Sequence, residues 1–335
     1  MKGARHQQSF SAVHFPRESL RRGGSRGHAG VQHEYNRAMR AGLVVLAAAM
    51  LAGGQTAGQT GEERLKAILS RVSEEAEVFL LAAPNLVGQE TFQQRAAKAP
   101  RRFRPRLGSA AIQVPKPQYS TREIVSEYGY SVLRGAPGQL HEFRQIVSID
   151  GRQIRSVEKA RTTLTLGLKS ADDRVKKRMV EDFKRHGLAE AAADFGPLIL
   201  LFGKRRLGDY SLALSGSGRI GAEAALVVSF RQVAGTGSLL IFEKRKALRQ
   251  PLEGEVWVRQ SDWLPLRIIL RSSRTEETYS VRDEATVDYV LSPHGVLVPV
   301  SVVHRQFAGD QLVVENLFRY SPFRKFTADT EIKFN

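Results

Sequence analysis

Tyr279-Ser280-Val281-Arg282-Asp283-Glu284-Ala285-Thr286-Val287-Asp288-Tyr289-Val290-Leu291 is the stretch that decides the fold. Tyr279, Val281, Ala285, Val287, Tyr289 and Leu291 share one face of an extended chain, and Ser280, Arg282, Glu284, Thr286 and Asp288 share the other. An alternation of period two predicts a strand with one face in the core and one in water. The stretch therefore predicts a sheet that is covered on one side only.

The same pattern continues on both sides of this stretch. Leu264, Leu266, Ile268 and Leu270 alternate with Arg267, and Val296, Val298, Val300 and Val302 form a further apolar face. Residues 260–263, 292–295 and 308–310 are turns of hairpin size, and strands joined by such turns run antiparallel. Pro265 and Pro299 fall inside strand patterns, which indicates an edge or a bulge at each.

Helical periods occur in two places. Residues 62–83 repeat apolar side chains every three or four positions, and residues 172–186 do so with Val175, Met179, Val180 and Phe183 on one face. A short helix is expected over 188–195, and Asp172-Asp173 suits a helix start. Strands are expected at 86–94, 121–133 and 141–149, with Gly135–Gly138 as a turn and residues 326–334 as a last strand. The fold class is α+β: a curved antiparallel sheet, an incomplete β-barrel, covered by an N-terminal helix and a helical insertion at 156–203.

The region before residue 61 resembles an export signal. Arg37 and Arg40 precede an uncharged apolar run, Ala41–Ala52, and small residues follow it. The run is too short to span a bilayer as a helix. We expect a signal peptide over about residues 39–57, cleaved after Gly54 or after Ala57, and hence a periplasmic or secreted protein. Residues 1–38 are then a non-native or disordered extension with Met39 as the true start, and residues 61–335 are one domain.

The charge is unevenly distributed along the chain, which has a net charge of +17. A Pro-containing loop is expected over residues 95–118, and its first half has six basic residues and no acid: Arg95, Lys98, Arg101, Arg102, Arg104 and Arg106. These residues predict contact with an anionic surface, with a plain solvated loop as the alternative. The sequence has no RNA-binding aromatic motif, zinc finger or basic zipper helix, so no nucleic acid is expected.

No catalytic set emerges from the sequence. There is no Cys, and His141, His186, His294 and His304 are widely spaced, so no metal and no cofactor are expected. His141 and Glu142 are adjacent in a predicted strand and face opposite ways. Gly216-Ser217-Gly218-Arg219-Ile220-Gly221 matches a dinucleotide-binding loop, but the strand-like residues after it favour a hairpin turn. We therefore expect a protein that is not an enzyme.

One hairpin carries a family resemblance. Gly254-Glu255-Val256-Trp257-Val258, followed by Leu264-Pro265-Leu266-Arg267, resembles a recurring element of the periplasmic lipoprotein-carrier superfamily that contains LolA, LolB and RseB-like proteins. The closing Tyr320–Phe326 is similar to the last strand pair of such proteins. Trp257 and Trp263 flank the hairpin and are interpreted as packing residues rather than a partner anchor.

The resemblance implies an incomplete barrel, a strongly curved sheet whose concave face is apolar and plugged by helices. Such a cavity can take the acyl chains of a lipid or a lipoprotein. The inward candidates are Val256, Val258, Leu266, Ile268, Val287, Tyr289, Val298 and Val300. The expected function is a carrier-like envelope protein that binds a hydrophobic ligand. The alternative is a non-enzymatic envelope sensor or interaction protein with a protein partner, and a more remote one is a nucleotide-binding enzyme that uses Gly216–Gly221.

Overall fold

The computed structural model describes residues 11–14, 60–98, 117–134, 136–186, 188, 195–234, 238–243, 246–275 and 279–326. Its helices are α1 (Gly61–Ala82), α2 (Val157–Lys169) and α3 (Asp173–Lys184), with the 3-10 helices η1 (Ala83–Asn85), η2 (Gly196–Phe202) and η3 (Leu207–Asp209). Its strands are β1 (Ser11–His14), β2 (Leu86–Ala97), β3 (Tyr119–Leu133), β4 (Ala136–Ile149), β5 (Arg152–Gln153), β6 (Tyr210–Ile220), β7 (Glu223–Gln232), β8 (Ser238–Glu243), β9 (Lys246–Gln250), β10 (Glu253–Arg259), β11 (Pro265–Thr275), β12 (Ser280–Leu291), β13 (Leu297–Ala308), β14 (Gln311–Tyr320) and β15 (Arg324–Lys325). None of the described helices is long and apolar enough to cross a membrane.

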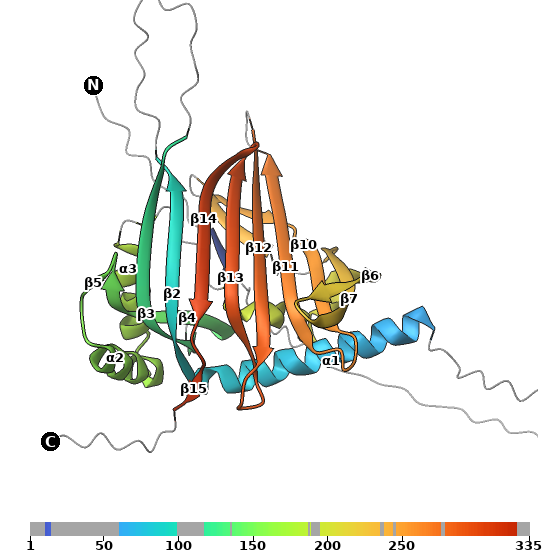
Figure 1. Ribbon diagram of the computed structural model, residues 1–335, viewed down its shortest axis with the longest axis horizontal. Coiled ribbons are helices and arrows are strands. Elements are labelled where there is room, and N and C mark those ends of the chain that lie inside the picture. The colour runs from blue at the N-terminus through green and yellow to red at the C-terminus, as the bar shows by residue number, and fades with distance from the viewer. Residues whose placement is uncertain are drawn as a thin grey trace, which may run out of the picture.

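One large antiparallel sheet dominates the molecule. Within the described residues it has twelve strands in the order β5-β4-β3-β2-β14-β13-β12-β11-β10-β7-β6, and β15 pairs with β2 off this path. The sheet is not closed into a barrel, and α1 runs across it near one end of the strands (Figure 1). The predicted fold class, a curved antiparallel sheet covered by an N-terminal helix and an insertion, is confirmed. A separate sheet has the order β1-β8-β9.

Both strand prolines lie at bulges in the middle of the sheet, not at its edges. Pro265 of β11 pairs with Val258 where the register to β10 shifts, and Pro299 of β13 pairs with Tyr289 where the register to β12 shifts. A bulge locally disrupts the ladder of hydrogen bonds, and prolines inside sheets are found mainly at bulges and on edge strands. The bulge alternative is thus confirmed, and the edge alternative is wrong.

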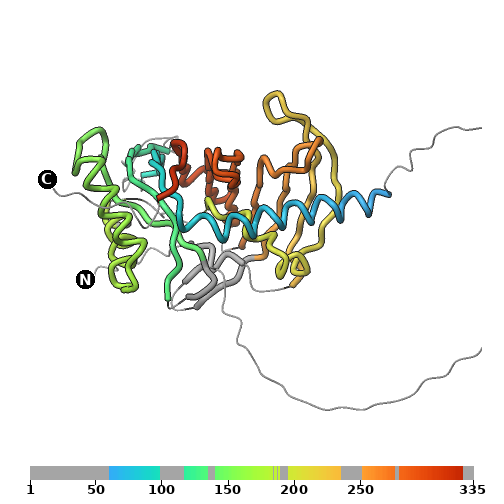
Figure 2. The backbone as a smooth tube through the Cα atoms, turned by 90° about the horizontal axis from the view of Figure 1, so that it is seen from below, coloured from blue at the N-terminus to red at the C-terminus, as the bar shows by residue number. Residues whose placement is uncertain are grey.

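The main core lies between the inner face of the sheet, α1 and η2. Thr60 caps α1 in a reciprocal capping box with Glu63, and Ile68, Val72, Ala76 and Phe79 are buried on the helix face that meets the sheet. Inner-face residues of β7, β10, β11, β12 and β13 join the same cluster. Seen from below, α1 spans much of the width of the sheet (Figure 2).

The helical insertion does not lie wholly on the inner face. Leu164 and Leu168 of α2 pack with Phe143 and Val87 in a second cluster on the outer face of β2 and β4. Helix α3 contributes Met179 to this cluster and Phe183 to the main core. The expectation that the sheet is covered on one side only is therefore wrong at β2–β4. Val175, which was expected to lie on the buried face of its helix, is 42 % exposed.

Several predicted boundaries need correction. Strand β2 runs on to Ala97, so Arg95 lies in a strand and not in the basic loop, and β4 begins at Ala136, inside the predicted turn. The turns at 260–263, 292–295 and 308–310 are present. The predicted signal at 39–57, the helix at 189–194 and the strand at 327–334 lie outside the described residues, as do most of residues 1–38 apart from β1. The start at Met39 stays a prediction.

Gly254, the first residue of the hairpin motif, is required by the close approach of three strands. A Cβ atom there would overlap the carbonyl oxygen of Ile269 on β11 and lie 2.9 Å from the ring of Phe230 on β7. A Cβ atom on Gly216 of β6 would meet no heavy atom within 4 Å. The two glycines therefore differ in what an added methyl group would meet.

Gly254→Ala should lower the free energy of unfolding by about 2–4 kcal/mol, because the methyl group must push two strands apart. Gly216→Ala is the matched control and should change it by less than about 1 kcal/mol. Urea unfolding followed by circular dichroism measures both. Equal effects of the two substitutions would contradict the packing described here.

Candidate functional site

Six of the eight predicted ligand-lining residues lie in the main core. Val256, Val258, Ile268, Val287, Tyr289 and Val298 are all at most 4 % exposed. Leu266 and Val300 are the residues that the register skips at the two bulges. Val300 is 38 % exposed, so its predicted inward orientation is wrong. A ligand-lining role for the others stays a prediction.

The chain itself fills the interior beside these residues. Helix η2 has the sequence Gly-Pro-Leu-Ile-Leu-Leu-Phe and lies against α1, β4 and β13. Leu198, Ile199, Leu201 and Phe202 are completely buried. Pro197, with φ −82° and ψ 20°, interrupts regular helix geometry near its start. A short apolar segment of the chain itself is thus part of the main core.

Three hydrogen bonds hold the start of η2 to the sheet. The Tyr289 hydroxyl donates to the Gly196 carbonyl at 3.0 Å and accepts from the Ile199 N–H at 3.2 Å. The Gly196 N–H donates to Glu142 Oε1 at 2.8 Å. A Cβ atom on Gly196 would lie 2.6 Å from Glu142 Oε1 and 2.8 Å from the Tyr128 hydroxyl, so only glycine allows this approach.

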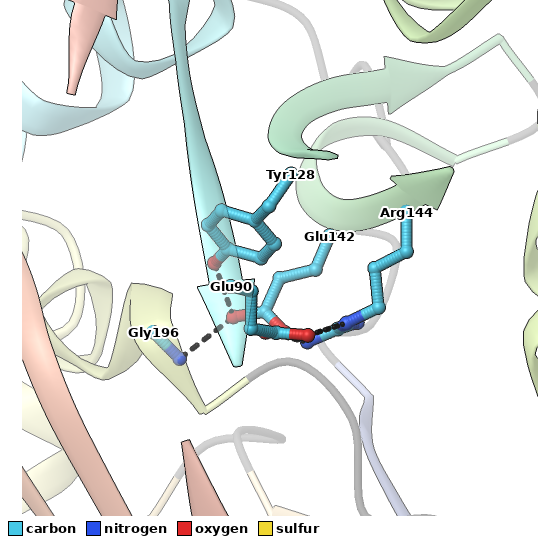
Figure 3. A network of polar contacts seen from close by, with 5 residues as sticks. All are labelled: Glu90, Tyr128, Glu142, Arg144 and Gly196. Atoms are coloured by element: carbon cyan, nitrogen blue, oxygen red, sulfur yellow. Dashed lines mark hydrogen bonds and ion pairs between the residues drawn. The ribbon is translucent and has the colours of Figure 1, made fainter. Parts of the chain in front are cut away.

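Glu142 also belongs to a buried ionic network (Figure 3). Arg144 donates to both oxygens of Glu90, at 2.6 Å and 2.8 Å, and to Glu142 Oε2 at 2.6 Å. The Tyr128 hydroxyl donates to Glu142 Oε1 at 2.8 Å. The three charged side chains are at most 4 % exposed. Glu142 therefore connects the guanidinium group on one side with the backbone of η2 on the other.

The two carboxylates keep Arg144 protonated. Burial by itself would lower the pKa of Arg144, but Glu90 and Glu142 raise it well above its usual value, so the guanidinium keeps its proton. Burial, and then the negative charge of Glu142, raise the pKa of Tyr128, of Tyr130 and of Tyr320 well above the usual range, so these hydroxyls stay protonated. The Tyr128 hydroxyl and the Gly196 N–H both donate to Glu142 Oε1.

A second row of buried polar residues crosses the inner face. Gln94 donates to Asn316 at 2.8 Å, and the Asn316 amide lies 3.1 Å from His304 Nδ1. His304 Nε2 and Gln306 both contact Asp283, at 3.2 Å and 3.0 Å. Because the Asn316 oxygen accepts from Gln94, its amide N–H₂ faces His304, which favours the tautomer with the proton on Nε2. The row links β2, β14, β13 and β12.

Other sequence candidates do not assemble into a site. Gly216 and Gly218 lie within β6, antiparallel to β7, and only Gly221, with φ +58°, occupies the turn, so the dinucleotide interpretation is wrong. The ring of Trp257 lies over Gly218, which agrees with a packing role. The described residues contain no group of three His, Asp or Glu that could hold a metal ion.

The predicted anionic-surface residues are only partly described. Arg95 is 3.3 Å from Glu315 and lies over the ring of Tyr119. Lys98 is in the described region at the end of β2, and its backbone N–H donates to the Gln118 carbonyl. Arg101, Arg102, Arg104 and Arg106 lie outside the described residues. Contact with an anionic surface stays a prediction.

The ionic network is not among the sequence-based predictions, although the sequence carries a signal for it. Glu142 and Arg144 are two residues apart in a strand, and the apolar Leu140 and Ile146 share their face. Opposite charges on the apolar face of a strand indicate a buried ion pair. Glu90 is likewise a charged residue on the apolar face of a strand, because it lies two residues from the buried Phe92 in β2. Nothing in the local sequence marks Gly196 as their partner.

Arg144→Met should destabilise the fold by about 3–5 kcal/mol, because the buried Glu90 and Glu142 then lose the cation that both of them contact. Urea unfolding followed by circular dichroism measures this.

The control combines Arg144→Met with Glu90→Gln and Glu142→Gln, which removes the two carboxylates together with their cation, and it should lose less stability than the single variant. A triple variant that loses as much stability as the single variant would contradict the ionic account.

No family model and no curated protein matches the chain. Among solved structures, the chain is similar to a DUF1329 family protein from Desulfovibrio piger, with 10 % identity, 81 % of this chain and 95 % of that chain covered, and a TM-score of 0.31. It is similar to a LolA superfamily protein from Nitrosomonas europaea, with 11 % identity and a TM-score of 0.28. The match covers 80 % of this chain and 97 % of that chain. It is also similar to a putative outer membrane lipoprotein-sorting protein domain from Vibrio parahaemolyticus, with 10 % identity and a TM-score of 0.30. The match covers 80 % of this chain and 95 % of that chain.

Proposed function

We propose that the protein is an exported, non-enzymatic envelope protein that binds a hydrophobic ligand, lipid or lipoprotein acyl chains, inside its half-barrel. The observation that carries the proposal is η2: a completely apolar segment lies on the inner face of the sheet and is held at its start by a few polar contacts. Acyl chains and the side chains of η2 offer the same kind of surface to the sheet. The signal-like segment at 39–57 supports export.

A hydrophobic ligand can bind on the inner face only if η2 moves away from it. An acyl chain that takes the place of Leu198, Ile199 and Leu201 gains about 0.8 kcal/mol per buried methylene group, which offsets the exposure of those side chains. Val256, Val258, Ile268, Val287 and Val298 would then line the ligand, with Leu266 beside them at the bulge. Tyr289 and Glu142 would lose their contacts to the start of η2.

Native mass spectrometry of the protein purified from the envelope should show additional mass that fragments as a lipid or an acylated peptide. A bare mass across independent preparations would contradict the carrier function. Such a result, together with a cross-linked protein partner, would favour the alternative function of an envelope sensor or interaction protein.

Tyr289→Phe should raise the affinity for a fluorescent lipophilic probe by about tenfold, because loss of the hydroxyl weakens the hold on η2 by roughly 1–2 kcal/mol. Fluorescence titration at matched fractions of folded protein measures it. Tyr119→Phe is the matched control: its hydroxyl donates to the Leu312 carbonyl, far from η2 in the sheet, and its loss should leave probe binding unchanged. Equal probe binding by both variants would show that η2 does not control access.

A further inference from the structure

The two edges of the main sheet differ sharply. At one edge lies β5, which has two residues and continues directly toward α2. At the other lies β6, which has eleven residues and pairs with β7 on one side; no described residue pairs with its other side. An open strand presents unpaired N–H and C=O groups, and proteins commonly protect such edges with charges, prolines or bulges.

The bulge at Ser215 divides β6 and leaves an unprotected first half, Tyr210-Ser211-Leu212-Ala213-Leu214. This half has neither a charge nor a proline. Leu212 and Leu214 pack against the main core but are only partly buried, although they face inward with Tyr210. The inner apolar face therefore extends to the edge strand of the sheet, on whose outer side no described strand pairs.

We infer that this half of β6 pairs antiparallel with the same segment of a second copy of the chain. The segment reads the same in both directions: apolar residues at 210, 212 and 214, and small residues at 211 and 213. A two-fold interface requires such self-complementarity. Pairing centred on Leu212 places Leu212 opposite its own copy, Tyr210 opposite Leu214, and Ser211 opposite Ala213, with every residue on the correct face of the joined sheet.

The position of α1 agrees with a sheet that continues past β6. Figures 1 and 2 both show the N-terminal end of α1 projecting beyond β6 and β7. A strand added at β6 therefore meets a helix that already extends past the edge of the sheet. The absence of charge on 210–214 also means that the two copies bring no like charges together at the axis.

The test is sedimentation of the full chain over a dilution series. The unmodified protein should sediment with the mass of two chains at high concentration and dissociate on dilution. Ser211→Lys with Ala213→Lys places lysines opposite each other twice and should give a monomer, because both positions are exposed and the fold tolerates them. Ser211→Glu with Ala213→Lys pairs opposite charges at the same two places and should restore the dimer.

Ser217→Lys, which is equally exposed but lies beyond the bulge, is the control and should leave the dimer intact. Circular dichroism verifies that each variant is folded. An unmodified protein that is monomeric throughout, a double-lysine variant that stays dimeric, or a Glu/Lys variant that stays monomeric overturns the inference.

Discussion

An open, curved antiparallel sheet has to bury its inner apolar face without closing on itself, and the rest of this structure follows from that constraint. Burial of apolar surface is the main favourable term in folding, so the inner face must find a partner. In this protein α1 covers it from one side of the molecule and η2 fills the space between helix and sheet. The same surface that stabilises the fold is thus the surface on which a hydrophobic ligand would compete.

The polar contacts on the inner face determine where η2 lies. Burying three charged side chains costs free energy, and an apolar set of similar volume is often at least as stable. The network is better understood as fixing position: Arg144 orients Glu142, and Glu142 and Tyr289 together fix the backbone at Gly196 and Ile199. Hydrophobic packing alone would leave the short apolar segment free to slide along the sheet.

The sequence predicted the sheet better than the site. The alternation in residues 279–291 and the short turns were enough for antiparallel pairing, since these features act locally. The prolines indicated an edge or a bulge, and the structure has a bulge at each. The predicted inward orientation of Val300 is wrong because Val300 is the extra residue of the bulge in β13, and its side chain does not lie on the inner face of the sheet. The amphipathic pattern of the insertion predicted helices but not the face of the sheet that each one covers. Glu90, Glu142 and Gly196 meet only through long-range pairing, which no local pattern encodes.

The central claim is that η2 and a hydrophobic ligand occupy the same place. Hydrogen exchange of residues 196–202, measured by mass spectrometry with and without a bound acyl lipid, tests it most directly. Displacement predicts faster exchange in this segment when the lipid is bound, while the strands β11, β12 and β13 keep their protection. Unchanged or slower exchange in residues 196–202 with lipid demonstrably bound would contradict the claim.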